Sequence, residues 1–292
     1  MMKILVTGGA GFIGTNLIKR LLSEGHKVHS LDNYDSGLVK NHQEGCKYIN
    51  DDIECIKGEK YDLCFHLAAL SRIQPSFENP KETFRVNVKG TEAVMEWARV
   101  NNVKVVYAGS SSKWHDPTIS PYAMYKYLGE EVCKLYRKTF NVNVEICRFY
   151  NVYGPNEIVD GDWAAVIGIW RNQVNKGEAI TIVGDGEQRR DFTHVDDIVD
   201  GLYKVGLSNT SLKDAWELGT GINYSINEVY QMFKNKFKVE CVYIKDQPGN
   251  YRKTLRENNK TLDLLGWKPQ DRLLYYINKL DKDDNKLRNN SL

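Results

Sequence analysis

The sequence predicts an α/β protein: a doubly wound parallel sheet forms the larger part, and a smaller mixed α/β part follows toward the C-terminus. Three observations lead to this prediction. Short apolar runs alternate with longer segments whose apolar residues recur at helical spacing, which is typical of a parallel sheet covered by helices on both faces. A glycine-rich turn joins the first run to the first helix. After about Asn151 the alternation becomes irregular and the elements become shorter.

The first half of the chain has the clearest pattern. Segment 12–23 carries apolar residues at helical spacing, and Gly25 is placed to end this helix. Further helices are predicted at 83–101 and 122–141. Strands are predicted at 4–6, 27–31, 47–49, 62–67, 104–108 and 143–147.

The second half is expected to hold a helix at 162–176, a strand at 179–183, a turn at 184–186 and a helix at 194–205. The charged and polar stretch 281–292 is expected to fray. The change of pattern predicts two domains. The first comprises residues 1–152 with a returning segment at about 191–218, and the second comprises residues 153–190 and 219–292.

Charge and composition exclude several classes of function. Lys and Arg number 40 and Asp and Glu number 38, so the net charge of +2 gives no general attraction to nucleic acid or to a membrane surface. No apolar run reaches about 18 residues and the start does not resemble a signal peptide, so a cytoplasmic location is expected. The 6 cysteines form no Cys-x-x-Cys pair, and we expect reduced thiols and no metal site.

The turn after the first strand carries Gly8, Gly11 and Gly14. The first glycine permits a tight turn, the second lets the backbone approach a pyrophosphate, and the third lets helix and strand pack closely. The helix N-terminus then offers free N–H groups to phosphates. Asp32 stands at the end of the next strand, where a carboxylate binds a ribose hydroxyl and repels a 2′-phosphate. We therefore predict a Rossmann-type domain that binds NAD rather than NADP.

Asp52 and Ile53 follow the strand predicted at 47–49. Taken alone, Asp52 is best interpreted as a surface residue that caps a turn. Its place after a strand of the same sheet also allows a contact with the adenine amino group, and both interpretations stay open.

Tyr122 and Lys126 are four residues apart on a predicted helix, so their side chains share one face. Pro121 is well suited to begin this helix. Three consecutive serines that begin at Ser110 follow the strand at 104–108, and ligands of open parallel sheets bind at the carboxyl ends of strands. A tyrosine is a base near neutral pH only if its pKa of about 10 is lowered, which a nearby ammonium and a positive nicotinamide ring both favour. A serine hydroxyl can hold the reacting oxygen.

Further blocks extend nearly from end to end of the chain. They are 6–14, 32–33, 36–37 with Asn41, 66–69, 87–91, 121–122 with Lys126, 148–155, 184–188, 190–192, 195–197 and 265–269. With these blocks the chain resembles the extended short-chain dehydrogenases/reductases, the NAD-dependent epimerases and dehydratases. Within that family it most resembles the UDP-glucose and UDP-N-acetylglucosamine 4-epimerases.

The resemblance implies roles for individual residues. Ser110 looks like the catalytic serine, and Ser111 is the alternate and a substrate contact. Tyr122 looks like the base, and Lys126 like the residue that holds the nicotinamide ribose. The set implied to bind NAD is Gly8, Gly11, Phe12, Ile13, Gly14, Asp32, Asn33, Asp52, Ile53, Leu67, Ala68, Ala69, Asn87, Tyr122 and Lys126.

On the substrate side, the resemblance implies that Asn151 contacts the phosphate or sugar and that Arg190 pairs with the diphosphate, for which a permanently charged fork is suited. The family often carries a second arginine where this chain has Gln247, and Arg252 is a candidate to compensate. Thr254 stands where strict UDP-galactose epimerases tend to have a tyrosine, so a pocket that admits an N-acetylhexosamine is expected.

A second departure follows the serines. The family usually has Val-Tyr-Gly where this chain has Lys-Trp-His at 113–115, and only residues 116–120 separate that point from Pro121, fewer than is usual. That segment normally lines the sugar side of the pocket. His115 is interpreted as a solvated loop histidine in preference to a substrate contact.

The implied reaction is 4-epimerisation of a nucleotide sugar, expected to be UDP-linked. Tyr122 takes the proton of the C4 hydroxyl, hydride passes to NAD⁺, the 4-keto sugar turns over, and hydride returns to the other face. The resemblance also implies a homodimer formed through a four-helix bundle of the helices at 83–101 and 122–141, with Val94, Trp97, Leu128, Val132 and Leu135 as candidate contacts.

Three alternatives stay open. A nucleotide-sugar 4,6-dehydratase needs an acid and a base after the serine block, where this chain has Ser111 and Ser112. An NADPH-dependent reductase, or a 3,5-epimerase/reductase, conflicts with Asp32. A non-catalytic NAD-binding protein on the same fold is a different class, against which Tyr122, Lys126 and Arg190 all argue.

Overall fold

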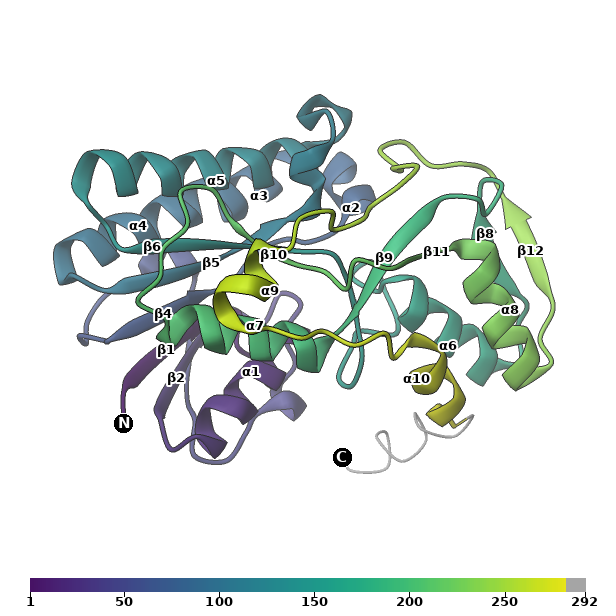
Figure 1. Ribbon diagram of the computed structural model, residues 1–292, viewed down its shortest axis with the longest axis horizontal. Coiled ribbons are helices and arrows are strands. Elements are labelled where there is room, and N and C mark those ends of the chain that lie inside the picture. Colours follow the sequence, from purple (N-terminus) through teal and green to yellow (C-terminus); the bar gives the residue numbers. More distant parts are fainter. Residues whose placement is uncertain (282–292) are drawn as a thin grey trace.

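Seven parallel strands form the central sheet, in the order β10-β6-β5-β4-β1-β2-β3 (Figure 1). The computed structural model describes residues 1–281. All the pairings of this sheet are parallel, which confirms the predicted fold class. The strands are β1 (Lys3–Thr7), β2 (Lys27–Asp32), β3 (Lys47–Asn50), β4 (Leu63–His66), β5 (Lys104–Ser110), β6 (Val144–Phe149) and β10 (Trp216–Leu218). Strand order reverses between β1 and β4, so the carboxyl ends of these two strands open a crevice for a ligand.

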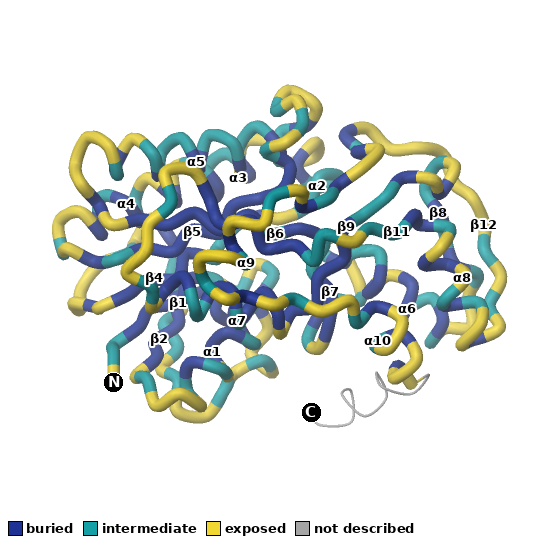
Figure 2. Tube along the Cα trace, in the orientation of Figure 1, coloured by how far each residue is buried: buried dark blue, intermediate teal, exposed yellow. Residues whose placement is uncertain are grey.

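Helices cover both faces of this sheet. On one face α1 (Phe12–Ser23) packs against α7 (Val195–Leu207), and on the other α4 (Gly90–Asn101) packs against α5 (Pro121–Phe140) (Figure 1). Each face has its own apolar core, built from the strands and the buried stripe of these helices. Figure 2 shows the central strands as the most buried part of the chain.

The path from β4 to α4 is more broken than the sequence predicts. In place of one helix over 83–101, the chain forms α2 (Ile73–Glu78), α3 (Pro80–Phe84), a π-helical turn at Arg85–Lys89 and then α4. Six residues are too few to give α2 a periodic pattern, and Pro80 begins the next helix. A search for apolar residues that recur every 3.6 residues does not detect a π turn. Such turns are common beside functional sites.

The smaller part has a core of its own. A sheet of β11 (Asn223–Ser225), β9 (Arg189–His194) and β7 (Asn151–Tyr153) and a parallel pair, β12 (Cys241–Ile244) with β8 (Ile180–Val183), pack with three helices. The helices are α6 (Val166–Lys176), α8 (Ile226–Phe237) and α10 (Leu273–Lys279). Short turns of 3₁₀ helix lie at Val39–Asn41, Ile53–Cys55, Ser111–Trp114 and Pro117–Ile119.

The chain crosses between the two parts more than once. After β9, α7 and β10 lie on the large sheet, close to the returning segment predicted at about 191–218. Near the end, α9 (Lys260–Leu265) contacts β10, and the buried Trp267 joins the core under α1 and α7. The predicted stretch 281–292 lies outside the described residues, except for Asp281. Within residues 1–281, no helix is long and apolar enough to cross a membrane.

Candidate active site

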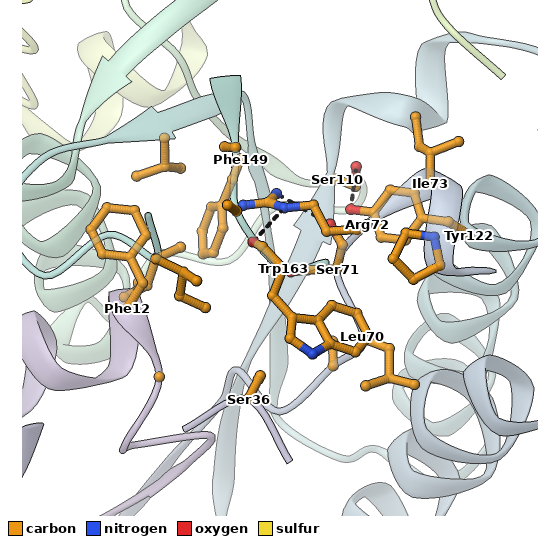
Figure 3. A pocket seen from close by; sticks show the side chains of 18 of the residues that line it. Phe12, Ser36, Leu70, Ser71, Arg72, Ile73, Ser110, Tyr122, Phe149 and Trp163 are labelled. Atoms are coloured by element: carbon orange, nitrogen blue, oxygen red, sulfur yellow. Dashed lines mark hydrogen bonds between the residues drawn. The ribbon is translucent and has the colours of Figure 1, made fainter. Parts of the chain in front are cut away.

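A cavity of about 690 Å³ lies where the carboxyl ends of the central strands meet the smaller part. One side is formed by the glycine turn after β1, the ends of β2, β4 and β5, and the start of α5. The other side is formed by segments at 149–152, 158–170, 181–192 and 247–254. Figure 3 shows side chains from both sides directed into this space. The position matches the switch point at which open α/β sheets bind their ligands.

The glycine turn leaves no room for side chains. Gly8 has φ +70°, and a Cβ there would lie 2.8 Å from the Ala68 nitrogen. A Cβ on Gly14 would lie 2.2 Å from the Gly8 carbonyl oxygen. Helix α1 begins at Phe12, and its cap residue Gly11 has no side chain to cover the helix N-terminus, which faces the cavity. This cradle fits a pyrophosphate held by backbone N–H groups.

Asp32 ends β2 with a firmly held carboxylate. Its Oδ2 accepts a hydrogen bond from the Ala10 nitrogen at 2.9 Å, and its Oδ1 accepts one from the Tyr34 nitrogen at 2.9 Å. The side chain is buried yet lines the cavity beside Asn33. A carboxylate fixed beside the glycine turn fits a dinucleotide ribose with free hydroxyl groups.

Asp52 lies differently from its neighbours. Its carboxylate forms two hydrogen bonds of 2.9 Å with Arg85 and caps the turn at the Glu54 nitrogen. The Arg85 guanidinium holds the pKa of this carboxyl below its usual range. Asp51 and Ile53 line the cavity, whereas Asp52 does not. The turn-capping interpretation therefore describes Asp52, and the expected adenine contact is not supported by its geometry.

The loop after β4 supplies Leu67, Ala68 and Ala69 to the cavity wall. Asn87, in the π turn, is buried behind this loop and does not line the cavity. Its Nδ2 donates to the Leu70 carbonyl oxygen at 2.9 Å, and its Oδ1 accepts from the Leu70 nitrogen at 2.8 Å. Asn87 thus fixes the backbone that forms the wall.

Ser110 and Tyr122 meet in the cavity. Ser110 ends β5, and Tyr122 lies in the first turn of α5, which Ser120 caps through the Ala123 nitrogen. The Tyr122 hydroxyl donates to Ser110 Oγ at 3.3 Å (Figure 3). Burial raises the pKa of Tyr122, while the Ser110 hydrogen bond and the charge of Arg72 oppose the shift.

Lys126 lies one turn further along α5 and also lines the cavity. Its Nζ donates to the Ala108 carbonyl oxygen at 2.5 Å and lies 4.6 Å from the centre of the Tyr107 ring. Burial lowers the pKa of Lys126 to about 8. Lys126 Nζ hydrogen-bonds the Ala108 carbonyl oxygen, and Arg72 is a cation that opposes the rise in the pKa of Tyr122. A lowering of the pKa of Tyr122 by Lys126 stays a prediction.

Asn151, Arg190 and Thr254 all line the cavity, and their contacts with a substrate stay predictions. Asn151 Nδ2 donates to Thr254 Oγ1 at 2.9 Å, so the threonine is held against the cavity wall. Arg190 Nη2 donates to Asn250 Oδ1 at 2.5 Å, and burial lowers the pKa of Arg190 to about 10. Ser111 is buried and also faces the cavity.

Two expectations about this side are corrected. Arg252 is not a cavity residue: its side chain is 69% exposed and pairs with Asp185 at 3.0 Å, so in this conformation it does not replace the cation missing at Gln247. His115 is not solvated but half-buried, stacked on Tyr251 with ring centres 4.1 Å apart. Burial lowers the pKa of His115.

Arg72, Trp163 and Tyr251 are among the residues of this cavity that sequence reasoning missed. Arg72 Nε donates to the Trp163 carbonyl oxygen at 2.8 Å, which joins the loop after β4 to the loop before α6 (Figure 3). A lone arginine just after the block 66–69 was the available signal. Trp163 and Tyr251 lie in irregular segments that carry no periodic pattern.

Comparison with known proteins agrees with this geometry. The pattern of the "NAD dependent epimerase/dehydratase family" matches residues 4–219. This chain belongs to that family. NAD is the family's cofactor, and the glycine cradle and Asp32 described above fit it.

Individual relatives extend the likeness over almost the whole chain. The UDP-glucose 4-epimerase of Mycolicibacterium smegmatis is 31% identical over 92% of this chain and 94% of its own. The UDP-glucuronic acid decarboxylase 1 of Danio rerio is 30% identical over 95% of this chain and 71% of its own. The crystal structure of the UDP-glucose 4-epimerase of Thermotoga maritima with UDP-glucose has a TM-score of 0.91, at 27% identity over 98% of this chain and 99% of that one. The chain is thus an enzyme-family member whose relatives modify nucleotide sugars by more than one reaction.

Proposed function

We propose that this protein is an NAD-dependent nucleotide-sugar 4-epimerase acting on a UDP-hexose or UDP-N-acetylhexosamine through a 4-keto intermediate. The observation that carries the proposal is the hydrogen-bonded pair of Tyr122 and Ser110, 3.3 Å apart, in one cavity with the cofactor cradle and with Asn151 and Arg190. Among the relatives, one named UDP-glucose 4-epimerase was solved with UDP-glucose.

The residues around the Tyr122–Ser110 pair have different roles in the proposed epimerisation. NAD supplies reversible hydride acceptance at the sugar carbon. Tyr122 holds the proton of the C4 hydroxyl at its phenol oxygen and gives it back when the alcohol is restored. To take up the C4 proton, Tyr122 must be a phenolate, which does not donate to Ser110; once protonated it donates to Ser110 Oγ, as in the structure, and the Ser110 hydroxyl hydrogen is free to bind the 4-keto oxygen. Lys126, fixed by Ala108 one turn along α5 from Tyr122, would bind a ribose hydroxyl of NAD.

The substrate side favours a nucleotide diphosphate and a roomy sugar site. Arg190 is a partly buried fork, directed into the cavity and suited to phosphate oxygens. The small Thr254, tied to Asn151, leaves space where a tyrosine would narrow the cavity, which supports acceptance of an N-acetyl group. Ser111 and Ser112 provide no acid–base pair for loss of water, so epimerisation is favoured over 4,6-dehydration.

The division into a cofactor domain and a substrate domain and the homodimer belong to the same proposal. In α4, Val94 and Trp97 are buried against the sheet, which leaves the outward face of α5 as the candidate contact, with Leu135 54% exposed. Light scattering that reports a monomer at micromolar concentration would exclude the four-helix-bundle dimer.

The deciding experiment is incubation of the purified protein with UDP-, GDP-, CDP- and dTDP-sugars, followed by proton NMR with and without added NAD⁺. We expect interconversion of a C4 epimer pair that is lost in Tyr122→Phe by a factor of about 10² or more. Loss of water, or no change in any sugar despite bound NAD, would refute the epimerase proposal.

A further inference from the structure

One cation of the cavity is not used by the reaction described above. Arg72 follows β4 and the wall residues 67–69, and its side chain lies in the cavity (Figure 3). It is held from two directions: Nε donates to the Trp163 carbonyl oxygen at 2.8 Å, and Nη1 donates to the Ser71 carbonyl oxygen at 3.3 Å. Both acceptors are neutral. They fix the direction of the guanidinium without neutralising it.

The charge of Arg72 has no partner within residues 1–281. No carboxylate within residues 1–281 forms an ion pair with the Arg72 guanidinium, and Arg72 Nη2 donates no hydrogen bond to any atom of these residues. Glu157 is the carboxylate whose charge acts on Arg72, but Glu157 is paired with Arg171 at 3.0 Å. Burial lowers the pKa of Arg72, which is the expected effect of removing a cation from water without a counter-ion.

A cation held in this way is suited to a bound anion. Buried charges in proteins are normally paired, and an arginine fork fits a carboxylate through two parallel hydrogen bonds. Since the protein supplies no carboxylate to Arg72, an anionic group of the ligand is the natural partner, and the position of Arg72 selects among the anions. The gain in affinity for such a ligand is larger than at a mobile surface arginine, because two hydrogen bonds already orient the guanidinium.

The position of Arg72 indicates which part of the ligand carries the anion. Figure 3 shows the Arg72 side chain beside Tyr122, the proton-holding residue, and the charge of Arg72 acts on that phenol. Arg190 instead hydrogen-bonds Asn250, in the segment at 247–254. The two arginines therefore serve different parts of the cavity, and Arg190 remains the candidate for the diphosphate. A group near Tyr122 belongs to the reacting sugar, in which the substituent on C5 neighbours the reacting C4.

We propose that Arg72 binds a carboxylate at C6 of the sugar, so that the substrate class is a nucleotide-linked hexuronic acid or its N-acetylated analogue in preference to a neutral hexose. The proposal rests on the nucleotide-sugar function proposed above, and it replaces the neutral sugar with an acidic one. Arg72 is the residue that makes this distinction.

The test compares binding of UDP-glucuronic acid and UDP-glucose to the NAD-loaded protein by isothermal titration calorimetry. The wild type should bind the acid tighter by about tenfold or more, because a hydrogen bond to a charged group is at stake. Arg72→Gln should abolish the preference, and Arg72→Lys should keep part of it, since the charge remains and the fork is lost. Arg20→Gln is the matched control: Arg20 pairs with the exposed Glu24 on α1, and its loss should change neither affinity.

Three results would overturn the proposal. The first is an equal affinity of the wild type for both sugars, and the second is a preference for the acid that survives in Arg72→Gln. The third is an equal loss of affinity for both sugars in that variant, which would mean that Arg72 acts only through Tyr122. If Arg72→Gln does not fold, judged by circular dichroism, the wild type and Arg72→Lys decide.

Turnover followed by NMR distinguishes a failure of the Arg72 assignment from a failure of the 4-epimerase proposal. If the acid is preferred in binding but no sugar is epimerised, the epimerase proposal fails and the assignment of Arg72 stands. If neutral UDP-sugars are epimerised and UDP-glucuronic acid is neither bound nor converted, the epimerase proposal stands and the assignment of Arg72 fails.

Discussion

Replacement of Arg148 by methionine should destabilise the protein strongly, because Arg148 is the cation of a buried charge network near the serine loop that follows β5. Its side chain is fully buried on β6 and pairs with Glu130 at 2.8 Å and with Glu217 at 2.9 Å, whose side chains are each 2% exposed. It also pairs at 2.8 Å with Asp214, which is 57% exposed and can be solvated when the arginine is absent. Arg148→Met therefore leaves two carboxylates buried without a cation.

Removing one partner of a buried pair costs about 3–5 kcal/mol, since the remaining charge has neither water nor a counter-ion. At roughly 2–4 °C per kcal/mol for chains of comparable size, the midpoint of thermal unfolding should fall by about 6–20 °C. Thermal or urea unfolding followed by circular dichroism measures this loss. In the matched control Arg20→Met, the broken pair with Glu24 is exposed and the cost should be about 0–1 kcal/mol.

The loss should also depend on pH. Burial already raises the pKa of Glu217, and the charge of Arg148 opposes that shift, so the pKa rises further in Arg148→Met. A carboxyl whose pKa is higher in the folded state than in the unfolded state takes up a proton on folding, so the variant gains stability as pH falls through that raised pKa. The difference in the free energy of unfolding between the wild type and Arg148→Met should therefore become smaller from pH 8 to pH 5. A gap below about 1 kcal/mol, or one that widens toward pH 5, would refute this reasoning.

Three further changes test the cofactor and sugar sites. Asp32→Asn should weaken NAD binding and shift the NAD-to-NADP affinity ratio by about tenfold or more, measured by titration calorimetry, because the charge that repels a 2′-phosphate is lost; an unchanged ratio would count against the role of Asp32. Gly14→Ala should abolish NAD binding in the same assay, because the new Cβ would lie 2.2 Å from the Gly8 oxygen; retained binding would contradict this. Thr254→Tyr should lower kcat/KM for a UDP-N-acetylhexosamine relative to the UDP-hexose by about tenfold or more, because the ring fills the space beside Asn151; a ratio that does not move would exclude Thr254 as the size filter.

Local sequence rules accounted for the elements whose chemistry is contained in a short segment. The glycine turn, Asp32, and the Tyr122–Lys126 spacing each follow from one strand–turn–helix unit, and the structure brings them into one cavity. The parallel sheet follows from the alternation of apolar runs with amphipathic helices. For these features, local pattern and global fold agree.

The errors came from side chains whose partner is distant in sequence. Arg252 is held by Asp185, and His115 by Tyr251. For Asp52, where two interpretations stood open, the distant Arg85 holds the carboxylate in its turn-capping position. In each case the residue type allowed a ligand contact, and a partner that no spacing rule identifies decided its direction. Arg72 is the opposite case, a cavity residue that no spacing rule predicts. Trp163 lies 91 residues further along the chain, and its carbonyl oxygen holds Arg72 in the cavity.

The proposed mechanism requires transient oxidation at C4 of the sugar, with Tyr122 as the proton-holding residue. A UDP-sugar that carries deuterium at C4 tests this directly, because the position of the deuterium can be followed in the product. The account predicts that the 4-epimer forms with the deuterium retained at C4 when the reaction is run in ordinary water, and that Tyr122→Phe forms it at least about 10²-fold more slowly. Formation of the epimer with hydrogen from solvent at C4, or full activity in Tyr122→Phe, would contradict the account.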